Sequence, residues 1–234
     1  MPVSDRQAVL DYQLIRENRW FFGLCGLFLL VAGYVLLQIN TGDDIFFFSE
    51  RRSGAGDWFF RWFTKMGEAW IYVPVLFYFL FQRYRQAIVI PLLGLTVTCF
   101  AYAFKTFFGQ DRPMAFLTKQ GLFDLVQTVQ GVEIHGGATS FPSGHTTSAF
   151  ALYTFVALCL PYKRTVAALL FAFAFLTGVS RIYLVQHFLK DVYAGALLGL
   201  FIGMFWYVVQ ERWDGSRRPW LDRSLADLRL KILD

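Results

Sequence analysis

The chain has 234 residues, of which 56% are hydrophobic and only 17% are charged. This composition excludes an ordinary soluble domain, because the apolar residues come in long uncharged runs. The net charge of +5 does not indicate nucleic acid, since the basic residues stand at the ends of these runs, as in membrane proteins. Cys25, Cys99 and Cys159 lie within apolar runs and lack metal-ligand spacing, so we expect core or lipid-facing cysteines.

The first part of the chain divides into three segments. Residues 1–19 are polar and predict a cytoplasmic segment, either an interfacial helix or disordered. The apolar run at about 20–38 predicts an uncleaved membrane helix, because no small-residue cleavage site follows it. Residues 40–68 mix aromatic and charged side chains, which predicts short helices in the headgroup zone. These helices form either an aromatic anchor or a lipid-access lip beside an active site.

Further apolar runs predict five more membrane helices, at about residues 68–82, 87–104, 145–160, 165–184 and 191–209. A polar, glycine-rich loop at 109–144 separates the third helix from the fourth. Residues 211–234 form a charged cytoplasmic tail with an amphipathic pattern at 221–233. We therefore predict an all-α fold with a single domain at 20–210, an integral membrane bundle of six transmembrane helices with short interfacial helices in the first outer loop.

Six crossings put both termini on one side of the membrane, and the distribution of Lys and Arg indicates which side. The termini and the loops at 83–86 and 161–164 hold 13 of the 22 basic residues. The opposite side holds nine, three of which belong to the motifs described below. The positive-inside rule then predicts a multi-pass protein of the plasma or inner membrane with cytoplasmic termini and the motifs at the outer face.

The stretch Pro142-Ser143-Gly144-His145 stands where the fourth membrane helix begins. A helix start leaves backbone N–H groups unpaired and carries a partial positive charge, so it is suited to binding an anion. Gly144 lets the backbone approach a ligand closely, and the imidazole of His145 can pass a proton at neutral pH. Alone, this stretch indicates only a possible phosphate site.

Lys105, Arg112 and Arg181 are predicted to meet at the same face of the bundle. Three converging cations repel one another, and a bound dianion relieves that repulsion. Arginine suits bidentate contact with phosphate oxygens, and lysine acts as a point charge. Snorkelling to the interface explains any one of these residues but not all three together.

His187 and Asp191 are four residues apart, so both lie on one face at a helix start. The carboxylate then fixes the imidazole tautomer and leaves the other nitrogen as a nucleophile towards phosphorus, or the pair only caps the helix. A zinc site built from His135, His145, His187 and Asp191 is possible by number. The neighbouring cations disfavour a divalent metal, so we expect neither metal nor cofactor.

Together the motifs read Lys-x6-Arg-Pro, then Pro-Ser-Gly-His, then Ser-Arg-x5-His-x3-Asp, over residues 105–191. This order resembles the three-part signature of the type 2 phosphatidic acid phosphatase superfamily, in its membrane lipid phosphatase branch, which is related at the pocket to the vanadium haloperoxidases. The resemblance implies that His187 attacks phosphorus to form a phosphohistidine, that Asp191 orients it, and that His145 protonates the leaving oxygen and then activates water. It also implies five residues that bind the phosphoryl oxygens: Lys105, Arg112, Ser143, Gly144 and Arg181.

Three residues depart from the pattern or lie outside it. Asp111 beside Arg112 either lowers anion affinity or pairs with the arginine, and Lys190 adds a cation of unknown purpose. His135 is interpreted as a loop residue, with a substrate contact as the alternative.

The sequence therefore predicts a membrane phosphatase that removes a phosphate from a lipid at the outer face of the membrane. Undecaprenyl diphosphate, phosphatidylglycerophosphate, phosphatidic acid and lipid A phosphate are equally compatible substrates. A lipid phosphotransferase using the same phosphohistidine is the alternative enzyme, and a non-catalytic binder or transporter of anionic lipid is the alternative of another class. A haloperoxidase is disfavoured because those relatives are not built of membrane helices. We expect the bilayer and a phosphorylated lipid as partners, with no nucleic acid and no obligatory protein partner.

Overall fold

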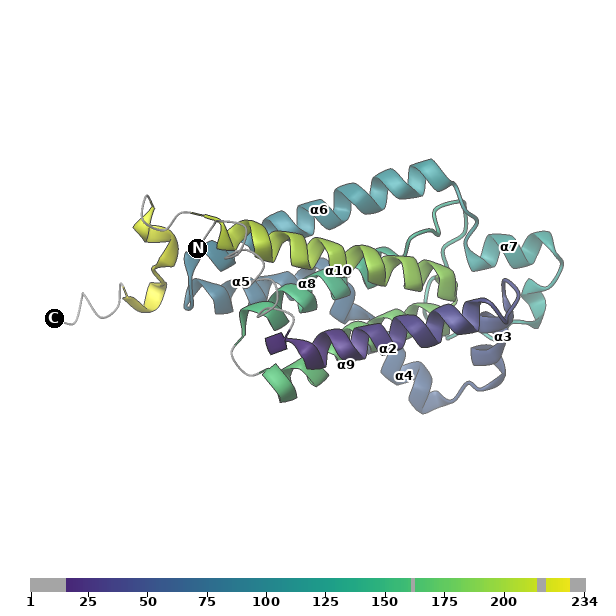
Figure 1. Cartoon of the computed structure of the whole chain (residues 1–234). Coiled ribbons are helices and arrows are strands. Elements are labelled where there is room, and N and C mark those ends of the chain that lie inside the picture. Colours follow the sequence, from purple (N-terminus) through teal and green to yellow (C-terminus); the bar gives the residue numbers. More distant parts are fainter. Residues whose placement is uncertain (1–15, 161–162, 214–217, 228–234) are drawn as a thin grey trace.

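The computed structural model describes residues 16–160, 163–213 and 218–227, and within these ranges every regular element is a helix. The long helices run side by side in an elongated bundle, so that α2 begins and α10 ends at the same end of it (Figure 1). Four helical stretches are long and apolar enough to cross a membrane: Arg19–Leu36 (α2), Tyr84–Lys119 (containing α6, Tyr84–Phe108), Thr165–Tyr183 (in α9, Lys163–Tyr183) and Leu189–Glu211 (α10).

The other two predicted membrane helices exist but are short. The apolar stretch Ala69–Leu80 combines a 3-10 turn, η2 (Ala69–Ile71), with α5 (Tyr72–Leu80). Helix α8 (Gly144–Cys159) has 16 residues and spans about 24 Å, less than the roughly 30 Å of a hydrocarbon core. The fold is therefore all-helical as predicted, whereas six full crossings stay a prediction.

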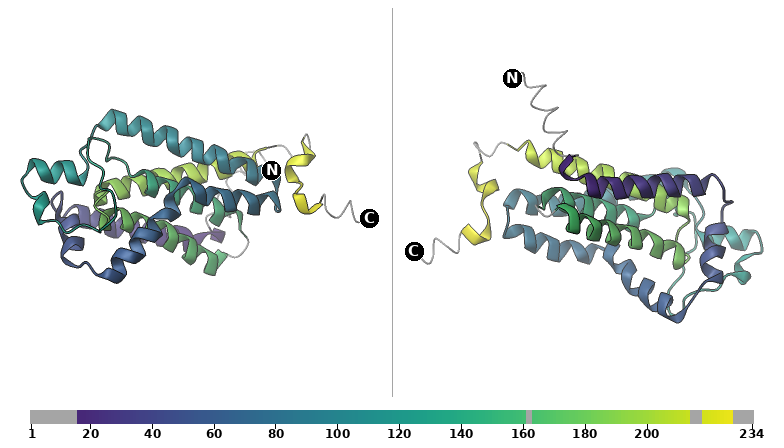
Figure 2. Two further views of the ribbon diagram at one scale, coloured as in Figure 1. Left: turned by 180° about the vertical axis from the view of Figure 1, so that it is seen from behind. Right: turned by 60° about the horizontal axis from the view of Figure 1, so that its bottom comes forward.

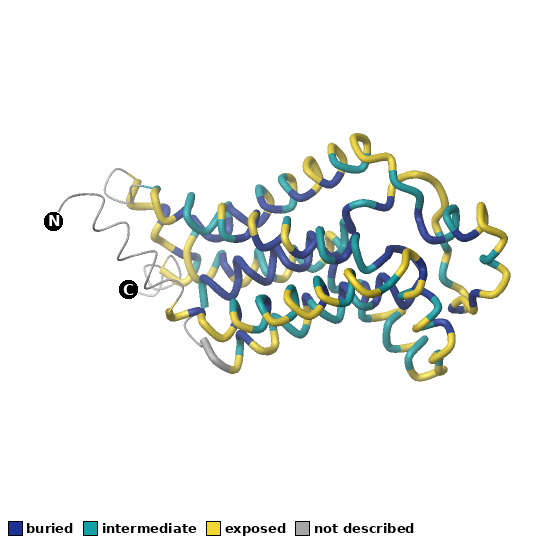
Figure 3. The backbone as a smooth tube through the Cα atoms, turned by 45° about the vertical axis from the view of Figure 1, so that its right-hand side comes forward, coloured by how far each residue is buried: buried dark blue, intermediate teal, exposed yellow. Residues whose placement is uncertain are grey.

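Helix α8 forms the centre of the bundle. Its side chains are buried without interruption from Thr146 to Leu158, and it packs against α10, α9 and α6. The buried residues accordingly gather along the middle of the bundle, while exposed residues follow its outer surfaces (Figure 3). From Ala149 onward the sequence of α8 has no charged residue on any face of the helix, which is typical of a helix that is covered on all sides.

Three glycines at four-residue spacing on α10 let it lie directly against the backbone of α8. A Cβ atom at Gly195, Gly199 or Gly203 would stand 2.5–2.8 Å from a carbonyl oxygen of α8 or of its N-cap residue, Ser143, closer than real contacts allow. Small residues that permit such close approach are the usual means of packing helices inside membranes. This contact fixes the beginning of α8 against the beginning of α10, where two of the three motifs lie.

Short helices and loops cover the end of the bundle that carries the motifs, opposite the start of α2 (Figures 1 and 2). They are α3 (Asp43–Glu50), α4 (Gly54–Phe63), η1 (Thr64–Gly67), α7 (Pro113–Lys119) and η3 (Phe123–Leu125). The short helices predicted within residues 40–68 are thus present, and they expose Phe47, Trp58 and Trp62. Their position in the headgroup zone stays a prediction.

Some predicted helix ends were wrong. Helix α6 does not end before Lys105 but continues to Phe108, where Gly109 takes a left-handed conformation (φ 53°). Lysine is a good helix former, so Lys105 lies within the last turns and not beyond them. In the tail, the stretch with the amphipathic pattern begins in a 3-10 turn, η4 (Pro219–Asp222), and is helical at residues 225–227. Residues 1–15 and 228–234 of the two terminal segments lie outside the described residues.

Candidate active site

The Ser143–Gly144 stretch begins α8 as predicted. Ser143 is the N-cap, and its Oγ accepts a hydrogen bond from the backbone N–H of Thr146 at 3.4 Å. A backbone hydrogen bond from Ser143 N–H to the carbonyl of Asp191, 3.0 Å long, joins this helix start to that of α10. Gly144 faces open space, and His145 follows it with its side chain about one-third exposed. The start of α8 is therefore accessible to a ligand.

His187 lies in the short loop between α9 and α10. The backbone N–H groups of Gln186 and His187 both donate to the carbonyl of Arg181, which holds the loop against the end of α9. The loop places His187 directly before Phe188, the N-cap of α10, and Asp191 in the first turn of that helix. Both side chains are almost completely buried. The two residues that the sequence predicts to act together are thus brought together.

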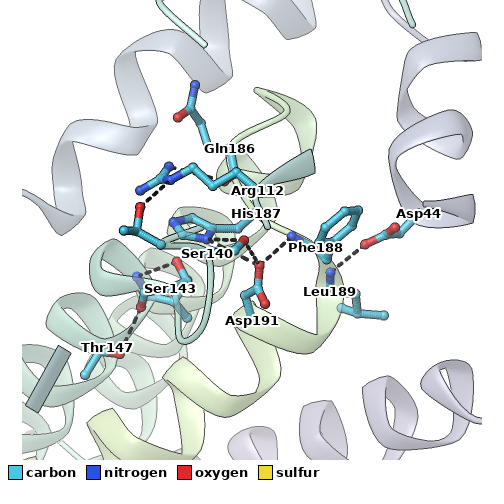
Figure 4. A network of polar contacts seen from close by, with 12 residues as sticks. Asp44, Arg112, Ser140, Ser143, Thr147, Gln186, His187, Phe188, Leu189 and Asp191 are labelled. Atoms are coloured by element: carbon cyan, nitrogen blue, oxygen red, sulfur yellow. Dashed lines mark hydrogen bonds and ion pairs between the residues drawn. The ribbon is translucent and has the colours of Figure 1, made fainter. Parts of the chain in front are cut away.

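Asp191 both orients His187 and caps α10 (Figure 4). Its Oδ2 lies 3.4 Å from Nδ1 of His187 and accepts a 3.0 Å hydrogen bond from Phe188 N–H. Ser140 Oγ donates to the same oxygen at 2.5 Å and lies 3.5 Å from His187 Nδ1. The two interpretations offered by the sequence, a helix cap and an oriented imidazole, therefore describe one carboxylate.

The protonation state of His187 follows from its surroundings. Burial lowers the pKa of His187 to about 4, and the hydrogen bond to Asp191 only partly opposes that shift. The imidazole is therefore neutral at pH 7, and its Nδ1 edge faces Asp191 and Ser140. A neutral imidazole with the opposite nitrogen available is the form required of a nucleophile.

The three predicted cations lie around His145 and His187. The charges of Arg112 and Arg181 act on Lys105, and those of all three act on His145. Arg112 and Arg181 are buried, with 8% and 6% of their surfaces exposed. Arg112 Nε donates to Thr139 Oγ1 at 3.2 Å, and an Arg181 guanidinium nitrogen donates to Thr64 Oγ1 at 2.6 Å.

The buried Arg112 and Arg181 and the half-buried Lys105 differ from two other basic residues, Arg85 and Arg52, in having no carboxylate partner. Within the part of the chain that the structure describes, no carboxylate oxygen lies within 4.0 Å of Lys105, Arg112 or Arg181. By contrast, Arg85 pairs with Asp222 at 2.6 Å and Arg52 pairs with Asp57 at 3.4 Å. Nε of Arg181, like Nε of Arg85, is buried without a hydrogen-bond partner among the described residues, so the carboxylate is what distinguishes the two arginines. Buried cations without partners are costly, so this site is built for an anion.

A cavity of about 620 Å³ opens from this site between the α5 segment and α6. Lys105, Gly144, His145 and Glu68 line its polar end. Further along, the walls are mainly apolar and include Pro91, Gly94, Leu95, Val97 and Ala101. The cavity therefore joins a polar mouth beside the cations to a long apolar groove.

The residues outside the motifs do not join the site. Asp111 pairs with Lys119 at 2.6 Å, so the suggested pairing with Arg112 was wrong. Lys190 lies over the ring of Phe188, and His135 is exposed, 3.8 Å from Glu133. Among the described residues, no group of three or more His, Cys, Asp or Glu side chains could hold a metal ion.

Ser140, Thr64 and Asp44 support the site but were not predicted to do so. Thr64 holds Arg181, and Asp44 Oδ2 accepts a 2.5 Å hydrogen bond from the backbone N–H of Leu189 at the start of α10. For Ser140, the one sequence feature that could have indicated this role is its position three residues before Ser143. Thr64 and Asp44 had none, because they approach the site from more than 100 residues away in the chain.

Comparison with known proteins identifies the family and the fold of the chain. The profile of the PAP2 superfamily matches residues 86–214. A lipid A 4′-phosphatase of Bacteroides thetaiotaomicron is 29% identical over 187 residues, which cover 76% of this chain and 79% of that protein. The crystal structure of Aquifex aeolicus LpxE is 32% identical and aligns with a TM-score of 0.60 over 71% of this chain and 93% of that one.

The crystal structure of a transmembrane PAP2-type phosphatidylglycerolphosphate phosphatase from Bacillus subtilis aligns with a TM-score of 0.59. This alignment covers 87% of this chain and 98% of that one at 21% identity, and it shows a shared fold. Since the family profile covers more than half of the sequence, the chain belongs to the PAP2 superfamily.

Proposed function

We propose that this PAP2 protein is a membrane lipid phosphatase that works through a phosphohistidine on His187, without a metal ion. The observation that carries the proposal is the group of three cations without carboxylate partners, Lys105, Arg112 and Arg181, around the buried His187–Asp191 pair. A phosphate dianion supplies the missing negative charge. The phosphatase names of the relatives support the same reaction class.

In the first step, the neutral His187 attacks phosphorus with the nitrogen that faces away from Asp191. The bond from phosphorus to the lipid oxygen breaks, and the proton of His145 goes to that oxygen. Asp191 stabilises the positive charge that develops on His187, while Lys105, Arg112, Arg181 and the N–H groups at Ser143 and Gly144 bind the phosphoryl oxygens. Charge neutralisation and positioning account for most of the barrier reduction in phosphoryl transfer.

In the second step, His145 takes a proton from water, and the water oxygen attacks the phosphohistidine. The bond from phosphorus to His187 breaks, and inorganic phosphate leaves. Both histidines return to their initial protonation states, so the cycle consumes one water and requires no cofactor.

The substrate is a lipid whose phosphate lies at the polar end of the cavity while a hydrocarbon chain follows the apolar groove between α5 and α6. The similarity to a lipid A 4′-phosphatase makes lipid A phosphate the substrate to test first. Undecaprenyl diphosphate, phosphatidylglycerophosphate and phosphatidic acid complete the test panel, since each presents a phosphate at a similar depth.

We further propose six crossings, by α2, the α5 segment, α6, α8, α9 and α10, with cytoplasmic termini and the site at the outer face. The excess of basic residues in the termini and in the loops at 83–86 and 161–164 supports this orientation. Accessibility of single cysteines to a membrane-impermeant reagent tests it. Labelling of a cysteine at Glu133 in intact cells supports the orientation, and protection of that position contradicts it.

The reaction is tested by phosphate release from the lipid panel with EDTA present, with and without vanadate. We expect metal-independent release that vanadate blocks and that His187→Ala abolishes without changing expression or behaviour in detergent. Activity retained in His187→Ala would exclude the phosphohistidine. Release that requires an acceptor lipid identifies a phosphotransferase, and vanadate binding without turnover identifies a binding protein.

A further inference from the structure

The mechanism requires a proton on His145 in a strongly cationic environment. Burial disfavours a positive imidazole at His145, and the charges of Arg181, Lys105 and Arg112 add to this effect. Asp191 does not pair with His145, because its Oδ2 faces His187 and accepts hydrogen bonds from Ser140 and Phe188 N–H. A negative charge close to His145, in addition to that of the substrate phosphate, therefore favours the protonated imidazole.

Glu68 provides such a charge. Its Oε1 lies 4.0 Å from Nε2 of His145, and both residues line the polar end of the cavity. The carboxylate also acts on Arg181. Its side chain is 42% exposed, so the carboxylate stays in contact with solvent. His145 and Glu68 thus form a second histidine–carboxylate pair beside the cations, in addition to His187 and Asp191.

The position of Glu68 is fixed by the turn that precedes it. Thr64 in this turn accepts the hydrogen bond from Arg181, and the carbonyl of Met66 accepts one from Tyr153 at 3.1 Å. Gly67 packs against α8 so closely that a Cβ atom there would lie 2.7 Å from the carbonyl oxygen of His145. Three contacts with the site and with α8 therefore hold the residue before Glu68 against His145.

We propose that Glu68 is a positioning residue that stabilises protonated His145 for transfer of its proton to the leaving oxygen of the lipid. This inference rests on the role proposed for His145 above. It predicts that loss of the Glu68 carboxylate lowers kcat/KM more for a substrate whose leaving group must be protonated than for one whose leaving group departs as an anion. A lipid alkoxide needs one, whereas nitrophenolate leaves without one at neutral pH.

The experiment compares Glu68→Gln with wild type on phosphatidic acid in detergent micelles and on p-nitrophenyl phosphate, using kcat/KM for each. This ratio reports the steps up to release of the alcohol or phenol. We expect kcat/KM for phosphatidic acid to fall about 10- to 100-fold, the range of general acid catalysis, and that for p-nitrophenyl phosphate by less than about threefold. The matched control is Glu133→Gln, which removes a similar Glu–His pair outside the cavity and leaves both values unchanged.

An equal loss on both substrates, or no loss on either, overturns the role of Glu68. Should Glu68→Gln fail to fold, Glu68→Asp keeps the charge at a greater distance and should show a smaller loss with the same dependence on the leaving group. Uniform loss in that variant also overturns the inference. Wild-type protein that releases phosphate from neither these two substrates nor any other lipid of the panel contradicts the proposed phosphatase itself, which distinguishes the two failures.

Discussion

Ser140 and Asp191 come from different segments and share a 2.5 Å hydrogen bond at the base of the site. Because Asp191 Oδ2 also faces His187 Nδ1, the serine hydroxyl fixes the carboxylate in the position that orients the nucleophile. Both side chains are fully buried, so water cannot replace the hydroxyl without rearrangement.

We therefore predict that Ser140→Ala lowers kcat about 5- to 30-fold, equivalent to losing 1–2 kcal/mol of orientation, with a smaller change in KM. Steady-state phosphate release measures both parameters. Ser224→Ala is the matched control, since Ser224 is also buried and donates to a carboxylate, that of Asp227, but lies in the C-terminal segment. Equal losses in the two variants would mean that Ser140 serves stability alone.

The low pKa of His187 is directly measurable by NMR of protein labelled with ¹⁵N-histidine in detergent, because the chain has only three histidines. We expect one imidazole, identified by its absence in His187→Gln, to titrate near pH 4. Since this pKa is below the unfolded value of about 6.5, the neutral ring contributes stability that is complete above pH 6.5 and is lost as the pH falls through about 4. A midpoint at or above 6.5 would contradict the burial of His187.

The positions that meet in the site were predictable, whereas most of their supporting partners were not. Lys105, Arg112, His145, His187 and Asp191 carry recognisable spacing, and the helices of the bundle bring their segments to one end of it. The sequence around each motif is sufficient to predict that they meet, because each motif adjoins an apolar run that predicts a membrane helix, and successive membrane helices run in opposite directions.

The partners of these residues depend on packing between distant segments. Thr64 meets Arg181, and Glu68 meets His145, only because Gly67 lets the turn approach α8. A single threonine or glutamate among aromatic residues has no periodicity that would indicate such contacts. The ends of α6 were equally unpredictable, because Lys105 remains helical and the helix ends only at Gly109.

The repulsion among the site cations predicts that removing one of them raises the stability of the protein and weakens its binding of phosphate. Lys105→Met removes a charge that Arg112 and Arg181 oppose, so we expect the Tm in detergent without phosphate to rise by about 2–4 °C, or roughly 1 kcal/mol. Inorganic phosphate should raise the Tm of wild type but much less that of the variant, because the bound anion supplies the missing charge. Thermal unfolding with and without phosphate measures both effects.

Arg85→Met is the contrasting variant for this experiment. Arg85 is buried, pairs with Asp222 and donates to the carbonyl of Gln210, so its loss should lower the Tm and leave the phosphate effect intact. A lower Tm for Lys105→Met in the absence of phosphate would show that Lys105 is not under repulsion.

The close contact between α10 and α8 gives the last prediction. A Cβ atom at Gly199 would lie 2.5 Å from the carbonyl oxygen of Thr147 and 2.7 Å from Cβ of Phe150, so Gly199→Ala forces the two helices apart. We expect a loss of about 1–3 kcal/mol in stability, the usual cost of overpacking. Activity should fall as well, because the shift loosens the hydrogen bond between Ser143 N–H and the carbonyl of Asp191.

The control is Gly26→Ala on α2, where nothing lies within 4 Å of the added atom, and this variant should leave stability and activity unchanged. Thermal unfolding and phosphate release, measured for both variants, distinguish an effect on helix packing from a general effect of alanine. A Gly199→Ala variant with the stability and activity of wild type would exclude the close contact.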